Sequence, residues 1–431
     1  MLSRCWGGLI LLTAVMVTVV VGCSSTDSSE PDTVGQKSDT DSTENDTGNT
    51  ESNYDTSSKW DTADTKEVTQ PLPPAISLET PVTEPGPFAV GYRQESVVYQ
   101  APGGQGERTL RLAVWYPATQ SGDGPPKYLD SWTRDNVYLN ADPASGNGSP
   151  WPVFVFSHGH QGFAEASWFL TEFLASHGFI VLAPDHTGNT LMDLIATAPT
   201  EIYYLRPYDL SATLDWLENL PAEHPLFGRA STTHIAVGGH SFGGYTAFAA
   251  ASADVPIDEL AEACAAGTGP SWVCSSMDPE DASVFATGFG DLRFRCALPM
   301  APGAAEVLGP SGVANVVIPV LLQTGNGDRS TPDSTQGDPY WNELSGEKDR
   351  RVRYLTGGHH TFSITCEVLP SLGANDGCGE NFMPFENAYD LVNAYSLAFL
   401  RAHLYEDPSV LPLLDGETSL SSEVMIEKHG P

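Results

Sequence analysis

A serine stands between two glycines where two differently patterned segments of the chain meet. Residues 239–243 read Gly-His-Ser-Phe-Gly, with Ser241 at the centre. An apolar run precedes them at 235–237, and an alanine- and aromatic-rich run follows at 244–251. Glycines on both sides permit a strained strand-to-helix turn that exposes the hydroxyl, and the helix N-terminus then faces any negative charge that develops there. The pattern predicts that Ser241 is a nucleophile; a glycine-rich connection that happens to contain a serine is the alternative.

A serine hydroxyl needs a general base to attack near neutral pH. Four histidines follow Ser241, at positions 359, 360, 403 and 429. His403 falls within an expected long helix and His429 near the end of the sequence, which suits structural roles. His359 and His360 lie in "YLTGGHHTF", directly after an expected strand. We expect His360 to be the base, with His359 as the alternative.

The base in turn needs a carboxylate that orients its imidazole. Asp328 lies in "VLLQTGNGDRSTP", in a glycine-rich turn after the expected strand that precedes the histidines. We expect Asp328 to be this acid. Asp333 and Asp338 are the alternatives, and a simple turn-forming role is the other interpretation of Asp328.

The oxyanion formed in such a reaction needs two backbone N–H donors. Phe242, the residue after the nucleophile, supplies one. The segment "VFSHGHQGF" supplies the other: His158 and Gly159 turn the backbone, and the amide of His160 is the expected donor. The two histidine side chains would pack or face solvent, with a metal site as a minor alternative. This chemistry requires no metal and no cofactor.

Short apolar runs alternate with helix-like stretches between about residues 88 and 410. Expected strands cover 95–100, 109–117, 151–159, 179–186, 234–239, 292–300, 316–328 and 350–360, and expected helices cover 164–178, 203–220, 242–252 and 387–404. Strands that alternate with helices indicate a mostly parallel sheet with helices on both faces. The first two strands, joined by a glycine-rich turn, are expected to run antiparallel to the rest of the sheet.

Residues 254–291 interrupt this alternation with a long, loop-like insertion. Loops of this length in a compact domain are usually functional or form a small subdomain. The insertion follows the helix after Ser241, so it either borders the site or is a surface excursion pinned by a disulfide.

Five cysteines fall in the region 88–410. An exported chain meets oxidising conditions, so disulfides are expected. Sequence alone does not fix connectivity, but proximity favours Cys264 with Cys274 and Cys366 with Cys378, leaving Cys296 buried and free.

The N-terminus has the pattern of an export signal. Arg4 precedes an apolar run, 9–21, that is too short to span a bilayer comfortably. Val20-Val21-Gly22-Cys23 resembles a bacterial lipobox, which implies removal of residues 1–22 and lipidation of Cys23; several acyl chains would anchor the chain to the cell envelope, at the outer membrane or cell surface. An ordinary signal peptide or membrane anchor with an incidental cysteine is the alternative.

The next segment, 23–87, is acidic, rich in Ser and Thr and poor in large apolar residues, and is expected to be a disordered tether. The catalytic domain is expected over 88–410 and a C-terminal tail over 411–431. The net charge of −35 makes nucleic acid an improbable partner. We expect the chain to be a monomer that binds an ester substrate and is attached to the membrane through its lipid anchor.

The segments "VFVFSHGHQGF", "LASHGFIVLAPDH", "GHSFGG" and "RFRCALPM" together resemble the platelet-activating-factor acetylhydrolase group and its dienelactone-hydrolase-like relatives. "GNGDRSTP" and "GGHH" are also similar to cutinases, which hydrolyse polyesters. The resemblance implies an α/β-hydrolase fold, Ser241 as nucleophile and His360 as base. It also implies structural roles for Arg206 and Asp209 in "LRPYDLSATLDWL".

The chain departs from these families at two points. The acetylhydrolases place their acid just after the strand equivalent to "RCALPM", where this chain has no aspartate, so Asp328 matches the cutinase position instead. Dienelactone hydrolases use a cysteine nucleophile, whereas this chain has a serine.

The expected function is a serine carboxylic ester hydrolase acting on short acyl esters of lipids or small molecules. The alternatives are a polyester hydrolase, a peptidase or thioesterase with the same triad, or a catalytically silent binding lipoprotein.

Overall fold

The computed structural model describes residues 73–74, 78–193, 199–274 and 279–429. The chain divides into two units, Met1–Lys66 and Glu67–Pro431. The expected signal segment, Cys23 and most of the expected tether lie outside the described residues, so export and lipidation stay predictions. Within the described ranges, no helix is both long and apolar enough to cross a membrane.

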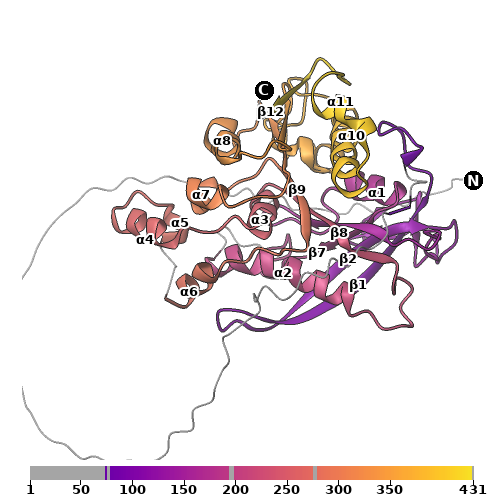
Figure 1. Cartoon of the computed structure of the whole chain (residues 1–431), viewed down its shortest axis with the longest axis horizontal. Helices are drawn as coiled ribbons and strands as arrows, with labels where there is room; N and C mark the ends of the chain where they lie inside the picture. The colour runs from indigo at the N-terminus through magenta and orange to yellow at the C-terminus, as the bar shows by residue number, and fades with distance from the viewer. Residues whose placement is uncertain (1–72, 75–77, 194–198, 275–278, 430–431) are drawn as a thin grey trace, which may run out of the picture. The chain divides into compact units, whose positions relative to one another are not determined.

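A ten-stranded sheet forms the centre of the second unit (Figure 1). Its order is β12-β11-β10-β9-β8-β6-β7-β2-β1-β5. The strands are β1 (Ala89–Ala101), β2 (Gly106–Ala118), β5 (Val137–Leu139), β6 (Trp151–Ser157), β7 (Ile180–Pro184), β8 (Ala230–His240), β9 (Phe294–Met300), β10 (Leu321–Gly325), β11 (Arg350–Tyr354) and β12 (Val424–Lys428). Strands β6 to β11 run parallel, and β12 is antiparallel to β11. The expectation that both opening strands run antiparallel to the rest holds only for β2, which pairs antiparallel with β7; β1 is antiparallel to β2 and so runs in the direction of the parallel strands. A separate small ribbon pairs β3 (Lys127–Tyr128) with β4 (Trp132–Thr133).

Helices cover both faces of the sheet, as predicted. The long ones are α1 (Trp168–Ser176), α2 (Glu201–Glu218), α3 (Phe242–Ala250), α7 (Ala305–Val313) and α10 (Phe385–Leu404), and the short ones are α8 (Asp338–Glu343), α9 (Thr365–Val368) and α11 (Leu411–Leu414). Successive strand residues point to opposite faces, so Val153 and Val155 pack with α2 and α3, whereas Phe154 and Phe156 pack with α1 and α10. This alternation gives the molecule one apolar core on each side of the sheet.

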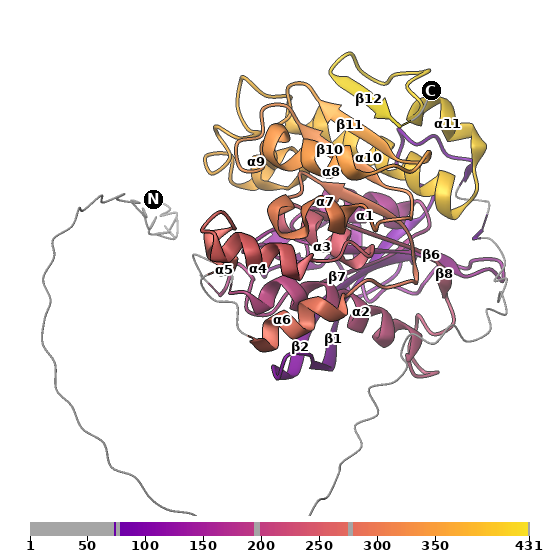
Figure 2. The ribbon, with the colours of Figure 1, turned by 60° about the vertical axis from the view of Figure 1, so that its left-hand side comes forward.

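The predicted insertion forms three further helices: α4 (Ile257–Ala265), α5 (Ser271–Cys274) and α6 (Pro279–Thr287). Figure 2 shows them on the α2 and α3 side of the sheet. Phe285 packs against Tyr204 of α2, and Ser311 of α7 donates a hydrogen bond to Glu259. The insertion is therefore a small helical subdomain that extends the α2–α3 layer. The predicted disulfide Cys264–Cys274 lies within it, the predicted Cys366–Cys378 bond lies between α9 and α10, and Cys296 is buried and free.

Two expected boundaries differ from the structure. Residues 78–87, expected to end the tether, pack on α1 and α10: Gly86 N–H donates to Ser176 Oγ at 2.9 Å, and Arg401 donates to the Thr80 carbonyl at 2.8 Å. Residues 411–428, expected as a tail, include α11 and the edge strand β12. Both segments belong to the folded domain. Residues 78–87 add hydrogen bonds and apolar contacts to the core, and β12 adds a strand to the edge of the sheet.

Candidate active site

Ser241 occupies the strained strand-to-helix turn that its sequence motif predicts. It follows β8 and precedes α3 with φ 59° and ψ −119°, a conformation that side-chain-bearing residues rarely adopt. The flanking glycines are required sterically, since a Cβ on Gly239 or Gly243 would overlap backbone atoms, including the Ser157 carbonyl. Ser241 N–H donates to the Met300 carbonyl at 2.9 Å, which fixes the turn to the end of β9. The turn holds Ser241 half-exposed at the carboxyl edge of the sheet.

The expected oxyanion loop lies directly beside this serine. A Cβ placed on Gly159 would stand 3.3 Å from Ser241 Cβ, so the loop after β6 approaches the nucleophile closely. Phe242 begins α3, so its N–H has no acceptor within the helix and is available to an incoming oxygen. The donor roles of the Phe242 and His160 amides stay predictions. The His160 ring is held by Asn189, with 2.8 Å between His160 Nδ1 and Asn189 Nδ2.

Arg206, predicted to be structural, is buried and organises the backbone of this loop. Its guanidinium donates to the His158 carbonyl, to Asn189 Oδ1 at 2.7 Å and to Thr246 Oγ1 of α3 at 3.0 Å. Burial, opposed by the charge of Asp209, lowers the pKa of Arg206 to about 9, so the group is still charged at neutral pH. Arg206 thus links the oxyanion loop to the helix that follows the nucleophile.

Asp209 lies in a neighbouring network of buried polar groups. Arg108 donates to both of its carboxylate oxygens, at 2.7 and 2.9 Å, and His186 Nδ1 lies 2.8 Å from Asp209 Oδ2. Burial and the charge of Arg206 hold the pKa of His158 and of His186 well below its usual range. Neutral, hydrogen-bonded rings of this kind fit a packing role, which is one of the roles expected for the His158 side chain.

Asp328 contacts His359, the alternative base, and not His360. Asp328 Oδ2 lies 3.0 Å from His359 Nδ1, and both side chains are buried. Thr331 supports the carboxylate: its N–H donates to Oδ1 at 2.6 Å and its hydroxyl lies 2.8 Å from Oδ2. The same hydroxyl lies 3.0 Å from the carbonyl of Ala301, just after "RCALPM". A carboxylate can only accept, so Nδ1 carries the proton and Nε2 of the neutral His359 ring is left as the proton acceptor.

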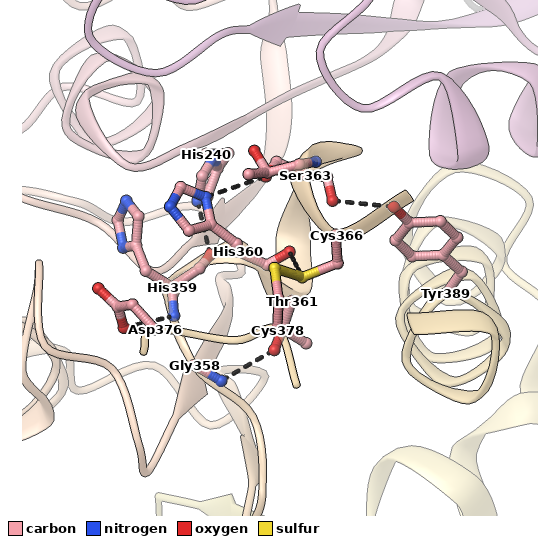
Figure 3. Close-up of a disulfide and its surroundings, with 11 residues drawn as sticks. His240, Gly358, His359, His360, Thr361, Ser363, Cys366, Asp376, Cys378 and Tyr389 are labelled. Atoms are coloured by element: carbon pink, nitrogen blue, oxygen red, sulfur yellow. Dashed lines mark hydrogen bonds between the residues drawn. A yellow bond between two sulfur atoms is a disulfide. The ribbon is translucent and has the colours of Figure 1, made fainter. Parts of the chain in front are cut away.

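The expectation that His360 is the base is therefore corrected by the geometry. The two residues begin a single 3₁₀ turn, His359–Phe362, and consecutive side chains in such a turn point in different directions. His360 Nδ1 lies 3.4 Å from Ser363 Oγ (Figure 3). Burial, and then the charge of His359, lowers the pKa of His360 to about 4.

The other expected alternatives have structural partners. Asp333 and Asp338 bind Arg351, at 2.7 and 2.8 Å. His403 packs edge-on against Phe399, and His429 stacks on Trp341 with 3.8 Å between ring centroids. Among the described residues, no hydrogen bond, ion pair or ring contact joins any of these four side chains to Asp328 or His359.

His240, which precedes Ser241 in the serine motif, makes a contact with the loop of the base that the sequence did not predict. Its Nε2 lies 3.0 Å from the His359 carbonyl and therefore donates, and the two rings are 4.6 Å apart between centroids. Burial, and then the charges of His359 and His360, keep its pKa well below the usual range, so the ring is neutral. His240 thus links the nucleophile turn directly to the loop of the base.

The described residues include no hydrogen-bond partner for Ser241 Oγ. Catalytic hydrogen bonds are often long before substrate binds and tighten in the complex. The described residues also contain no group of three or more His, Cys, Asp or Glu side chains arranged to hold a metal. The arrangement offers a strained serine, a buried carboxylate–imidazole pair and helix N-terminal amides, which together suit acyl transfer.

Known proteins are similar to this chain in sequence and in fold. Residues 139–264 match the family described as Chlorophyllase. A platelet-activating factor acetylhydrolase from Cavia porcellus is 23% identical over 344 residues, which cover 66% of this chain and 68% of the relative. A ferulic acid esterase from Streptomyces cinnamoneus has a similar structure, with a TM-score of 0.58 and 22% identity over 81% of this chain and 99% of that one. These similarities confirm the predicted α/β-hydrolase fold and the resemblance to esterases that have it.

Proposed function

We propose that this carboxylic ester hydrolase of the α/β-hydrolase fold acts through an acyl-enzyme on Ser241, with His359 as general base and Asp328 as the orienting acid. The observation that carries the proposal is the buried contact of Asp328 Oδ2 with His359 Nδ1 at 3.0 Å, on a loop that His240 ties to the serine turn. That contact selects one tautomer of His359 and presents Nε2 for proton transfer.

The reaction follows from these roles. Ser241 Oγ attacks the ester carbonyl while His359 Nε2 takes the hydroxyl proton, and the oxyanion accepts hydrogen bonds from the Phe242 and His160 amides. His359 then protonates the leaving alcohol, which departs and leaves an acyl ester on Ser241. Water, deprotonated by His359, attacks this ester and releases the acid. Asp328 stabilises the imidazolium that forms in each half of the reaction.

We further propose that the substrates are short acyl esters of lipids or small molecules. The matching relative from Cavia porcellus is named a platelet-activating factor acetylhydrolase, and acetyl is a short acyl group, which supports short acyl esters as substrates. Polyesters, thioesters and peptides are the alternative substrates. The chain is proposed to be exported, lipid-anchored at Cys23 to the cell envelope, and monomeric.

Esterase assays on the purified full chain in detergent test this function. We expect hydrolysis of p-nitrophenyl esters that is fastest for acetate and butyrate and falls towards palmitate. Ser241→Ala should lower kcat/KM by about 10⁴-fold or more, since the acyl-enzyme cannot form. A fluorophosphonate should label the wild-type chain at Ser241, which mass spectrometry of the peptide would locate.

Equal rates for the wild-type chain and Ser241→Ala would refute the nucleophile. A maximum at palmitate, or hydrolysis of an insoluble polyester at comparable rates, would refute the substrate class and leave the mechanism intact.

A further inference from the structure

We propose that Asp376 is a positioning residue of the site: its carboxylate ties the loop that carries Asp328 to the loop that carries His359, and the Cys366–Cys378 disulfide holds that carboxylate in place. This inference rests on the proposed function, because the two loops it joins carry the proposed acid and base. Asp376 itself contacts neither Ser241 nor the reacting atoms assigned above.

One carboxylate receives donors from both loops. Oδ1 accepts the Arg329 N–H at 2.8 Å and the His359 N–H at 3.2 Å. Oδ2 accepts the Ser330 N–H at 3.0 Å and the Ser330 hydroxyl at 2.7 Å. The Asp376 carbonyl also accepts the His360 N–H at 2.9 Å. The residues after Asp328 and the backbone of His359 are therefore held at a fixed separation by one side chain.

The segment that carries Asp376 is pressed against the histidine turn. A Cβ on Gly358 would come within 2.7 Å of the Asp376 carbonyl carbon, and one on Gly377 would come within 2.8 Å of the His360 nitrogen. Only glycines allow the two backbones to approach this closely. Figure 3 shows the carboxylate of Asp376 directed at the His359 nitrogen.

The disulfide closes the loop between α9 and α10 just beyond Asp376. Cys378 N–H donates to the Gly373 carbonyl at 2.9 Å, and Asp376 N–H donates to the same carbonyl at 2.9 Å. Residues 369–384 form no helix or strand, so the bond to Cys366 is the covalent restraint nearest to Asp376. A cross-link of this kind removes alternative conformations of the loop it closes.

The charge of Asp376 also acts on the proposed base. Burial opposes its ionisation, but the donors from Arg329, Ser330 and His359 outweigh burial, and the pKa of Asp376 lies below its usual value. Its carboxylate is thus negative at neutral pH. The titratable groups that face His359 are Asp328 from the loop after β10, His240 from β8, His360 from the same turn, and Asp376. Removing the negative charge of Asp376 disfavours the imidazolium form of His359.

The test is Asp376→Asn, with Glu380→Gln as the matched control. Glu380 lies exposed on the same loop, so its change removes the same charge from the same segment. We expect Asp376→Asn to lower kcat by about 10- to 100-fold with little change in KM, the scale of a small misplacement of reacting groups. The acidic limb of kcat/KM should move to lower pH. Glu380→Gln should change neither quantity.

The two disulfides provide a second matched pair. Cys366→Ala/Cys378→Ala should lower kcat in the same direction as Asp376→Asn, whereas Cys264→Ala/Cys274→Ala removes the disulfide of the insertion and should leave kcat unchanged. The thermal unfolding midpoint of each variant separates misfolding from misplacement. Should Asp376→Asn fail to fold, Ser330→Ala, which removes one donor only, should still lower kcat by about two- to fivefold, less than the full loss of the carboxylate.

Wild-type kcat and an unshifted pH profile in folded Asp376→Asn would overturn the inference, as would wild-type kcat in Ser330→Ala if Asp376→Asn does not fold. Failure of the proposed function gives a different result: the wild-type chain would then lack esterase activity, or Ser241→Ala would retain it.

Discussion

The two adjacent histidines of "GGHH" differ in what they contact. His359 faces Asp328 and His240, whereas His360 faces Ser363 and the loop of Gly373. We expect His359→Ala to lower kcat/KM by about 10³-fold or more, because no other histidine among the described residues is hydrogen-bonded to Asp328 and able to take the proton of the serine. His360→Gln should change kcat/KM by less than about tenfold. Steady-state kinetics on a p-nitrophenyl ester measure both.

The pH profile provides an independent measure of the same assignment. Because the pKa of His360 is lowered to about 4, its ring is neutral above pH 5, and a base at this position would place the acidic limb of kcat/KM near pH 4. A limb near pH 4 that disappears in His360→Gln would contradict the assignment of His359.

The sequence predicts which residue types form the site better than it predicts which of two adjacent histidines is the general base. Ser241 and Asp328 could be located because each follows an expected strand in a glycine-rich turn. The choice between His359 and His360 depends on the rotation of a 3₁₀ turn, which no local pattern determines. Asp376 could not be predicted, because its carboxylate oxygens accept hydrogen bonds mainly from backbone N–H groups. A backbone N–H is present at nearly every position, so it leaves no signal in the sequence.

At the scale of elements, the alternation of strands and helices predicted the parallel sheet and the layers on its faces. The edge strand β12 was missed because "SSEVMIEK" is short and polar, with few apolar residues in alternation. Edge strands need only one apolar face and are often short and charged. β12 nevertheless pairs with β11, whose end leads directly to the His359 turn.

Removal of residues 417–431 should therefore destabilise the sheet at the edge nearest the proposed base. It exposes the hydrogen-bonding edge of β11 and removes the ion pair of Glu427 with Arg353, 3.1 Å apart. We expect the thermal midpoint to fall by about 2–4 °C, on the order of 1 kcal/mol, and the chain to self-associate through the open edge. Calorimetry and size-exclusion chromatography measure these effects.

Glu427→Gln is the control for that truncation, since it removes the charge and keeps the strand. Its arginine partners Arg351 and Arg353 keep their ion pairs with Asp333, and partly exposed ion pairs contribute little, so its midpoint should stay within about 1 °C of wild type. A truncated chain with an unchanged midpoint and elution volume would show that β12 adds nothing to the stability of the domain.

At the scale of the whole molecule, composition marks where the acidic segment begins but not where the folded domain begins. Residues 78–87 read "LETPVTEPGP", which is as polar and proline-rich as the segment before it. The hydrogen bonds that attach them to α1 and α10 run through their main chain: the Thr80 carbonyl accepts from Arg401, and the Glu84 carbonyl lies 2.8 Å from His177 Nε2. Main-chain contacts leave no compositional signal, which explains why the expected boundary at residue 88 falls too late.

A pair of truncations tests this boundary. A chain that starts at Phe88 loses three hydrogen bonds: Arg401 to the Thr80 carbonyl, His177 Nε2 to the Glu84 carbonyl, and Gly86 N–H to Ser176 Oγ; a chain that starts at Gln70 keeps them. Because each such hydrogen bond contributes about 0.5–1.5 kcal/mol, the chain from Phe88 should unfold about 5 °C or more below the chain from Gln70. The chain from Gln70 should match the full chain in midpoint and in kcat. Equal midpoints for the two truncated chains would place 78–87 outside the cooperative unit, with the boundary at residue 88 after all.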